Sequence, residues 1–158
     1  MAPGSAGAGA PRIPRRQALD ERGVLRAARY PFRRIVGVEL SSSLCRIAAA
    51  NVAARRDQLR CADIELVTAD AARYAIPDDV TVVYLYNPFR GAVFQAVVDG
   101  LLKSLERSPR PLRVIYRTPL EEDLLLGTGR FRLTRAARGL RPGRAWSRKM
   151  SIRVYTAV

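Results

Sequence analysis

The chain has 158 residues, of which 48% are hydrophobic, and it carries a formal net charge of +14 with no histidine. This length suits one domain with a buried core, and the longest strongly apolar run, residues 80–86, is too short to cross a membrane. The missing histidine excludes Ser-His-Asp and Cys-His catalysis and histidine metal centres, and the two cysteines indicate neither a disulfide framework nor a metal site.

The first 18 residues are rich in Ala, Gly, Pro and Arg and show no periodicity, which predicts a disordered tail. They also lack the apolar stretch of a secretory signal, so we expect a cytoplasmic protein without a membrane partner. Residues 19–158 are predicted to form one α/β domain. It begins with a helix from about Asp20 to Tyr30, which Pro31 ends.

Strands and helices then alternate along the chain. Strands are predicted at 34–40, 64–68, 80–86, 112–116, 131–134 and 152–155, and helices at 44–59, 93–105 and 121–126. The continuous apolar run 80–86 is typical of a strand covered on both faces. This alternation predicts a doubly wound, mostly parallel, Rossmann-like sheet with helices on both faces. The last two strands lack a helix between them and should therefore be antiparallel.

Two of the predicted strands end in a carboxylate, Glu39 and Asp70. In sheets of this kind, ligands bind beyond the carboxyl ends of the strands. Glu39 can accept hydrogen bonds from both ribose hydroxyls of a nucleoside, and Asp70, one strand over, would face the adenine edge. The alternative interpretation is that each acid only caps its strand and pairs with nearby arginines.

A third strand ends in the group YNPF, residues 86–89. The proline holds Asn87 extended, so that its side-chain amide can accept a hydrogen bond from a substrate amine. Phe89 or Tyr86 can stack on a flat group. Taken alone, the same four residues also suit an ordinary turn with aromatic packing.

From about residue 23 to residue 158 the sequence resembles the class I S-adenosylmethionine-dependent methyltransferases. The stretches that carry the resemblance are YPFRRIVGVELS, LVTADAARY, VVYLYNPF and the closing SIRVYTAV. The resemblance implies that Glu39 holds the ribose of S-adenosylmethionine and that Asp70 and Ala71 border its adenine. It also implies that Asn87, Pro88 and Phe89 line the site of methyl transfer.

The implied reaction moves a methyl group from S-adenosylmethionine to an acceptor that the sequence does not identify. A sulfonium methyl group is already activated, because its leaving group departs neutral. Alignment of acceptor, methyl group and sulfur is then the main task of the protein, and alignment can supply about 7–11 kcal/mol. Such chemistry does not need a histidine.

The beginning of the chain departs from the family pattern. The family opens with a strand and a glycine-rich loop, D-x-G-x-G-x-G, that lies against the methionine part of the cofactor. Here the equivalent region reads RRQALDERGVLRAARY, in which Asp20 and Gly23 are the matching residues. Prolines and arginines at 11–16 disfavour a central strand.

We therefore expect the first strand of the family, which lies mid-sheet, to be missing or degenerate. Its neighbours would keep unpaired edges and a groove between them. A truncated or frame-shifted gene product, or a diverged relative without catalysis, would have this form.

Two other functions suit parts of the sequence. The charge of +14 is compatible with a non-catalytic methyltransferase-fold module that binds RNA or DNA through an arginine-rich surface. A Rossmann dinucleotide enzyme shares the acid after the second strand, but its G-x-G-x-x-G fingerprint is absent, and the YNPF group favours the methyltransferase.

Overall fold

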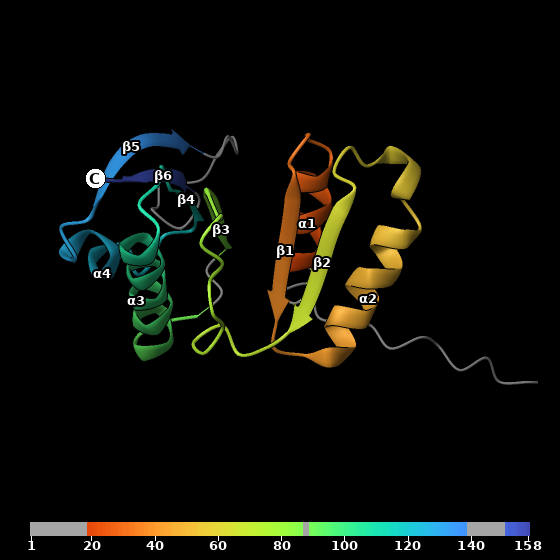
Figure 1. The fold of residues 1–158 in the computed structure, drawn as a ribbon, viewed down its shortest axis with the longest axis horizontal. Coiled ribbons are helices and arrows are strands. Elements are labelled where there is room, and N and C mark those ends of the chain that lie inside the picture. Colours follow the sequence, from red (N-terminus) through yellow and green to blue (C-terminus); the bar gives the residue numbers. More distant parts are fainter. Residues whose placement is uncertain (1–18, 87–88, 139–150) are drawn as a thin grey trace, which may run out of the picture.

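The computed structural model describes residues 19–86, 89–138 and 151–158. The described helices are α1 (Leu19–Ala28), α2 (Ser42–Ala53), α3 (Ala92–Arg107) and α4 (Glu122–Gly127), with a short 3₁₀ helix at Arg56–Gln58. The strands are β1 (Arg34–Glu39), β2 (Asp63–Thr68), β3 (Val82–Tyr86), β4 (Arg113–Arg117), β5 (Phe131–Arg138) and β6 (Ser151–Ala157) (Figure 1). The expected disordered tail, residues 1–18, lies outside the described residues.

The strands form two groups. β1 and β2 pair in parallel as a two-stranded sheet, and the other strands form a sheet of order β3-β4-β6-β5. β3 and β4 are parallel, whereas β6 is antiparallel to both β4 and β5. The α/β class, the parallel pairs and the antiparallel C-terminal pair are therefore confirmed. None of the helices in the described ranges is long and apolar enough to cross a membrane.

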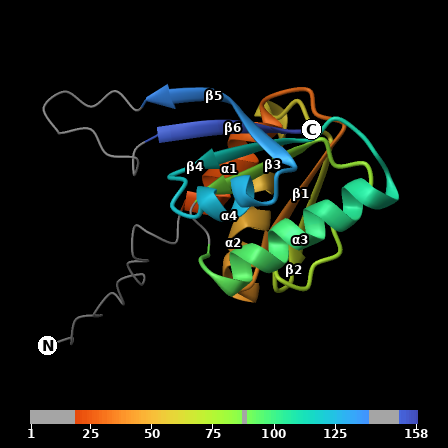
Figure 2. The ribbon, with the colours of Figure 1, turned by 90° about the vertical axis from the view of Figure 1, so that its left-hand side faces the viewer.

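The main core lies on the four-stranded sheet beneath α3 and α4. The apolar stripe predicted for residues 93–105 faces this core through Phe94, Val98, Leu101 and Leu105. The Phe94 ring stacks on that of the buried Tyr116, with centroids 5.4 Å apart. Helices α3 and α4 accompany this sheet, whereas α1 and α2 accompany the two-stranded sheet (Figures 1 and 2).

The second helix begins where predicted and ends early. The Ser41 side chain caps α2 by accepting a hydrogen bond from the Leu44 N–H at 3.4 Å. The sequence predicted helix to about residue 59, but α2 ends at residue 53. The backbone N–H groups of Arg60 and Cys61 both donate to the Ala28 carbonyl, at 2.8 and 3.0 Å. This contact turns the chain back toward β2, so tertiary bonding rather than helix propensity decides the end of α2.

Gly37 lets α1 pack directly against β1. A Cβ atom at this position would lie 2.8 Å from Leu66 Cδ2 and 3.0 Å from Val24 Cγ2, closer than packed carbon atoms approach. The side of β1 that carries Gly37 therefore faces α1. The neighbouring residues of the strand, Val36 and Val38, face the opposite side.

The third strand is less covered than its sequence predicted. Leu85 is buried, but Tyr84 is 45% exposed. The reason is that β3 pairs only with β4, and within the described residues no strand occupies the space between β3 and β1. An ion pair between Arg34 Nη2 and Asp79 Oδ1, at 3.1 Å, joins the start of β1 to the segment leading into β3. Within the described residues, the facing edges of β1 and β3 are unpaired.

Candidate functional site

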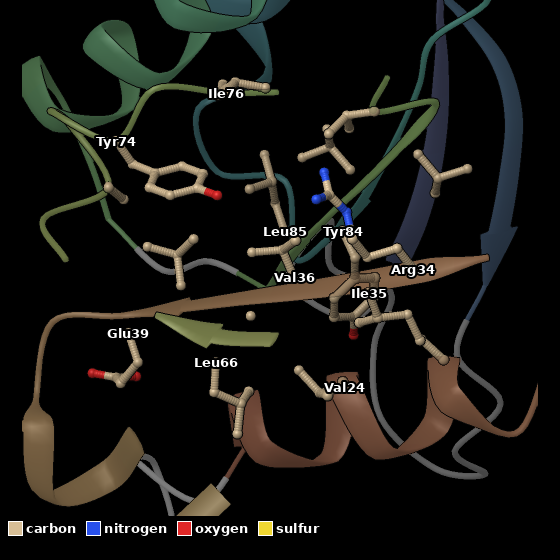
Figure 3. A pocket seen from close by; sticks show the side chains of 18 of the residues that line it. Val24, Arg34, Ile35, Val36, Glu39, Leu66, Tyr74, Ile76, Tyr84 and Leu85 are labelled. Carbon is tan, nitrogen blue, oxygen red and sulfur yellow. The ribbon is translucent and has the colours of Figure 1, made fainter. Parts of the chain in front are cut away.

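A cavity of about 590 Å³ lies between α1, β1 and β3 and is closed on another side by the segment that follows β2 (Figure 3). Its volume falls within the range of about 300–1,000 Å³ that is usual for small-molecule sites. Most of its lining is apolar and includes Val24, Val36, Leu66, Ile76 and Leu85. Glu39 lies at the end of the cavity where β1 finishes.

Five of the residues singled out from the sequence line this cavity. They come from five separate parts of the chain: Gly23 from α1, Glu39 from β1, Ala71 from the loop after β2, Tyr86 from β3, and Phe89 from the approach to α3. The order of strands and loops thus brings together residues up to 66 positions apart, from 23 to 89. Asn87 and Pro88 lie outside the described residues.

Among the described residues, the Glu39 carboxylate uses one oxygen in a structural hydrogen bond and leaves the other without a partner. The residue is half-buried, and its Oε1 accepts a hydrogen bond from the Ser41 N–H at 2.9 Å, which holds the turn into α2. The other carboxylate oxygen, Oε2, makes no hydrogen bond or ion pair within the described part of the chain. Glu39 therefore caps the strand end and still has an oxygen available for a ligand.

Asp70 does not take the position expected of it. It is exposed and is not part of the cavity lining. Its Oδ1 accepts a hydrogen bond from the Ala72 N–H at 2.9 Å, which stabilises the turn after β2. As a result, the Asp70 side chain is exposed to solvent, and Ala71 lines the cavity instead. Neither Glu39 nor Asp70 pairs with an arginine among the described residues.

The aromatic residues near the end of β3 already have partners. The Arg117 guanidinium lies over the Tyr86 ring, 4.7 Å from its centroid. The Phe89 ring tilts against the ring of Phe94, with centroids 6.3 Å apart, and so joins the main core. Both Tyr86 and Phe89 nevertheless line the cavity and can offer it an aromatic surface.

Tyr74 is a cavity residue to which the sequence assigned no role. It reaches into the cavity from the segment after β2 (Figure 3). Burial raises the pKa of the Tyr74 hydroxyl, the charge of Glu65 adds to this, and Arg34 opposes it. The hydroxyl therefore stays protonated at neutral pH and can donate a hydrogen bond. Tyr74 belongs to the stretch LVTADAARY, but its spacing from Asp70 gives no sign that it turns inward.

Comparison with known proteins identifies the fold. No protein-family model matches the chain, and no curated protein sequence matches it. Among solved structures, the Streptococcus pneumoniae protein Sp1610, provisionally named a tRNA (m1A22) methyltransferase, is 16% identical, with a TM-score of 0.55 over 89% of this chain and 60% of that one. The Escherichia coli protein yhhF, provisionally named a methyltransferase, is 13% identical, with a TM-score of 0.55 over 79% of this chain and 64% of that one.

A third similar structure is the precorrin 8w decarboxylase of Methanobacterium thermoautotrophicum, which is 18% identical, with a TM-score of 0.52 over 80% of this chain and 70% of that one. The chain thus spans less than two thirds of the length of Sp1610 and yhhF. At these identities the likeness concerns the fold and not the reaction. The parallel strand pairs, the antiparallel C-terminal pair and these neighbours show that the chain has the fold of the class I S-adenosylmethionine-dependent methyltransferases.

Proposed function

We propose that the chain binds S-adenosylmethionine at the end of this cavity where Glu39 lies and transfers its methyl group to an acceptor. The observation that carries the proposal is Glu39 Oε2, which lies at the end of β1 and has no partner among the described residues. A carboxylate oxygen there can accept hydrogen bonds from ribose hydroxyls. Ala71, Phe89 and Tyr86 also line the cavity, and the two aromatic rings offer surface for a flat group.

The residues present fit the nucleoside part of this cofactor. The end of the cavity where β1 finishes offers one carboxylate acceptor, from Glu39. The segment that the family resemblance places against the methionine part is residues 15–30, and from residue 19 on it forms the helix α1 rather than a glycine-rich loop. When bound, the cofactor supplies an activated methyl group, and the chain supplies orientation and an apolar wall that excludes water.

The Glu39→Gln variant tests the cofactor site. Glutamine keeps an acceptor for the Ser41 N–H but loses the negative charge toward the ribose, so we expect affinity for S-adenosylmethionine to fall about 10- to 100-fold. Isothermal titration calorimetry on the full chain measures this change. The matched control is Glu106→Gln, because Glu106 is exposed on α3 and does not line the cavity.

Two results would contradict the proposal. The first is an absence of saturable heat from the unaltered chain at about 1 mM cofactor, which corresponds to less than about 4 kcal/mol of binding free energy. The second is an equal loss of affinity in the Glu39 and Glu106 variants, which would indicate a general charge effect rather than a ribose contact.

Nucleic-acid binding is the second candidate function, and a specific surface favours it. Arg26, Arg29 and Arg55 border one shallow cleft of about 240 Å³ beside Gln58, between α1 and the end of α2. All three arginines are exposed, and the chain as a whole carries a charge of +14. Clustered guanidinium groups of this kind suit the phosphates of RNA or DNA.

This candidate predicts a steep dependence of binding on salt. If the three arginines each contact a phosphate of a single-stranded RNA, they contribute about −2 to the slope of log K against log salt. Replacing all three by glutamine should therefore make the slope shallower by about 2, as measured by fluorescence anisotropy with a mixed-sequence RNA. An RNA affinity that stays constant between about 50 and about 200 mM salt would rule out nucleic-acid binding through these arginines.

A further inference from the structure

The two sheets face one another across unpaired strand edges. Backbone groups of alternate residues in a strand point to opposite sides. The Glu39 carbonyl accepts a bond from the Ala69 N–H on the β2 side, so Val36 and Val38 direct their N–H and C=O groups away from β2. These groups point toward β3, and within the described residues they have no backbone partner.

The edge of β3 that faces β1 also carries backbone N–H and C=O groups without a backbone partner among the described residues. The Thr81 carbonyl accepts a bond from the Arg113 N–H on the β4 side. Val83 and Leu85 therefore also point their backbone groups to β4, whereas Val82 and Tyr84 point theirs toward β1. Two rows of donors and acceptors thus lie opposite each other across one gap, which is part of the cavity.

Apolar side chains line both faces of this gap. On the face toward α1 lie Val24 and Ile35, with the Tyr84 ring 3.3 Å from the position that a Cβ of Gly23 would take. On the opposite face lie Val36 and Ile76 (Figure 3). Val24, Ile35, Val36 and Ile76 are only half-buried, although such residues are usually buried. Whatever fills the gap must therefore be apolar on both faces and carry hydrogen-bonding groups along both edges.

An extended polypeptide strand has both properties, and a small apolar molecule does not. The sequences of the two longest segments outside the described residues do not favour such a strand. Residues 1–18 contain prolines and arginines throughout their second half, and residues 139–150, GLRPGRAWSRKM, contain no run of β-branched residues. A strand covered on both faces needs a continuous apolar run without proline.

We propose that the gap between β1 and β3 is a docking site for one extended apolar strand of another polypeptide. The strand pairs with both edges at once and joins the two sheets into one. β1 has six residues and β3 has five, so the docked segment has five or six residues, rich in Val and Ile and free of proline. This inference does not rest on the proposed function, because the docked strand takes the part of the cavity between β1 and β3, whereas the cofactor is proposed for the end where Glu39 lies.

The test uses the full chain and the synthetic peptide KKVIVVIVKK at concentrations where the peptide is monomeric. Its apolar run matches the six residues of β1, and its lysines suppress non-specific attraction to a chain of charge +14. NMR hydrogen exchange should show slower exchange for the amides of Val36, Val38, Val82 and Tyr84 when the peptide is added. The amide of Val83, which faces β4, should not change.

Backbone methylation of the peptide separates strand pairing from simple apolar contact. N-methylation of alternate residues removes the donors toward one edge, and N-methylation of the other set removes those toward the second edge. Each modified peptide should bind at least about tenfold more weakly, by calorimetry, than the parent. If both bind as tightly as the parent, or if only one set matters, the gap does not hold a strand paired on both edges and the proposal is overturned.

Variants of the chain give an independent control. Val36→Lys places a charge in the gap and should abolish peptide binding, whereas Val93→Lys, at an exposed position of α3 outside the cavity, should leave it unchanged. Equal binding by both variants would overturn the proposal. If Val36→Lys fails to fold, the methylated peptides still decide the question on the unaltered chain. Absence of any binding by the parent peptide at about 1 mM would also overturn it.

Discussion

Replacing Glu122 by alanine is expected to lower the free energy of unfolding by about 3–5 kcal/mol. Glu122 begins α4 and is 6% exposed. Its Oε2 accepts a hydrogen bond from the Tyr155 hydroxyl at 2.7 Å and forms an ion pair with Arg153. Removal of the carboxylate leaves the Arg153 charge and the Tyr155 hydroxyl without their acceptor in a largely buried position.

The protonation of Tyr155 supports this view of the network. Burial raises the pKa of Tyr155, and the hydrogen bond to Glu122 and the charge of Glu122 raise it further. The hydroxyl therefore keeps its proton at neutral pH and acts as the donor to the carboxylate. Arg153 Nε is buried and has no hydrogen-bond partner in the described part of the chain, so the guanidinium depends strongly on its bond to Glu122.

Urea unfolding followed by circular dichroism measures the effect of the Glu122 variant. The control is Asp123→Ala, because Asp123 is exposed in the same first turn of α4 and should cost less than about 1 kcal/mol. A loss below about 1 kcal/mol for Glu122→Ala would show that Arg153 and Tyr155 find other partners and that the network contributes little.

Replacing Arg110 by alanine should cost about 2–4 kcal/mol of stability. The guanidinium of Arg110 uses all five of its N–H donors. Nε donates to the Val80 carbonyl at 2.7 Å, and the other nitrogens donate to the Ser104, Ser108 and Pro77 carbonyls and to the Ser104 hydroxyl. Arg110 therefore ties the end of α3 to the segment that leads into β3.

Lysine and a neighbouring arginine provide the controls for this prediction. Arg110→Lys keeps the charge but cannot reproduce five fixed donors, so it should recover only part of the loss. Arg107→Ala removes an ion pair with Asp78 in which the side chains are 53% and 45% exposed, and it should cost about 0–1 kcal/mol. Equal unfolding temperatures of the Arg110→Ala and Arg107→Ala variants would contradict the central role of Arg110.

Arg110→Ala should also lower the affinity of the cavity for any ligand, because Pro77 and Val80, whose carbonyls Arg110 binds, line the cavity.

Part of the candidate site could be predicted from the sequence. The carboxyl ends of neighbouring parallel strands meet at one edge of a sheet, so residues at those ends fall near a common cavity. Glu39 and Phe89 do line one cavity, together with Gly23 and Ala71. Asp70 does not line the cavity, because its side chain accepts a hydrogen bond from the Ala72 N–H. An exposed aspartate readily forms such a bond with the backbone two residues further along the chain.

By itself, the sequence determined the local elements and their buried faces. Apolar spacing of three and four residues placed α3 on the core through Phe94 and Leu101, and the lack of a helix between the last two strands made them antiparallel. These features depend on neighbours a few residues apart, and short-range periodicity records them directly.

Only the tertiary structure decided what depends on contacts between distant segments. The position where α2 ends depends on hydrogen bonds to the Ala28 carbonyl. The exposure of β3 depends on the gap beside it. The burial of Glu122 depends on its contact with β6, more than twenty residues further along the chain. In each case the stabilising free energy comes from hydrogen bonds or packing between segments that are far apart in the sequence, and a local sequence pattern does not record such contacts. The chain must first fold and bring those segments together before either partner gains a contact.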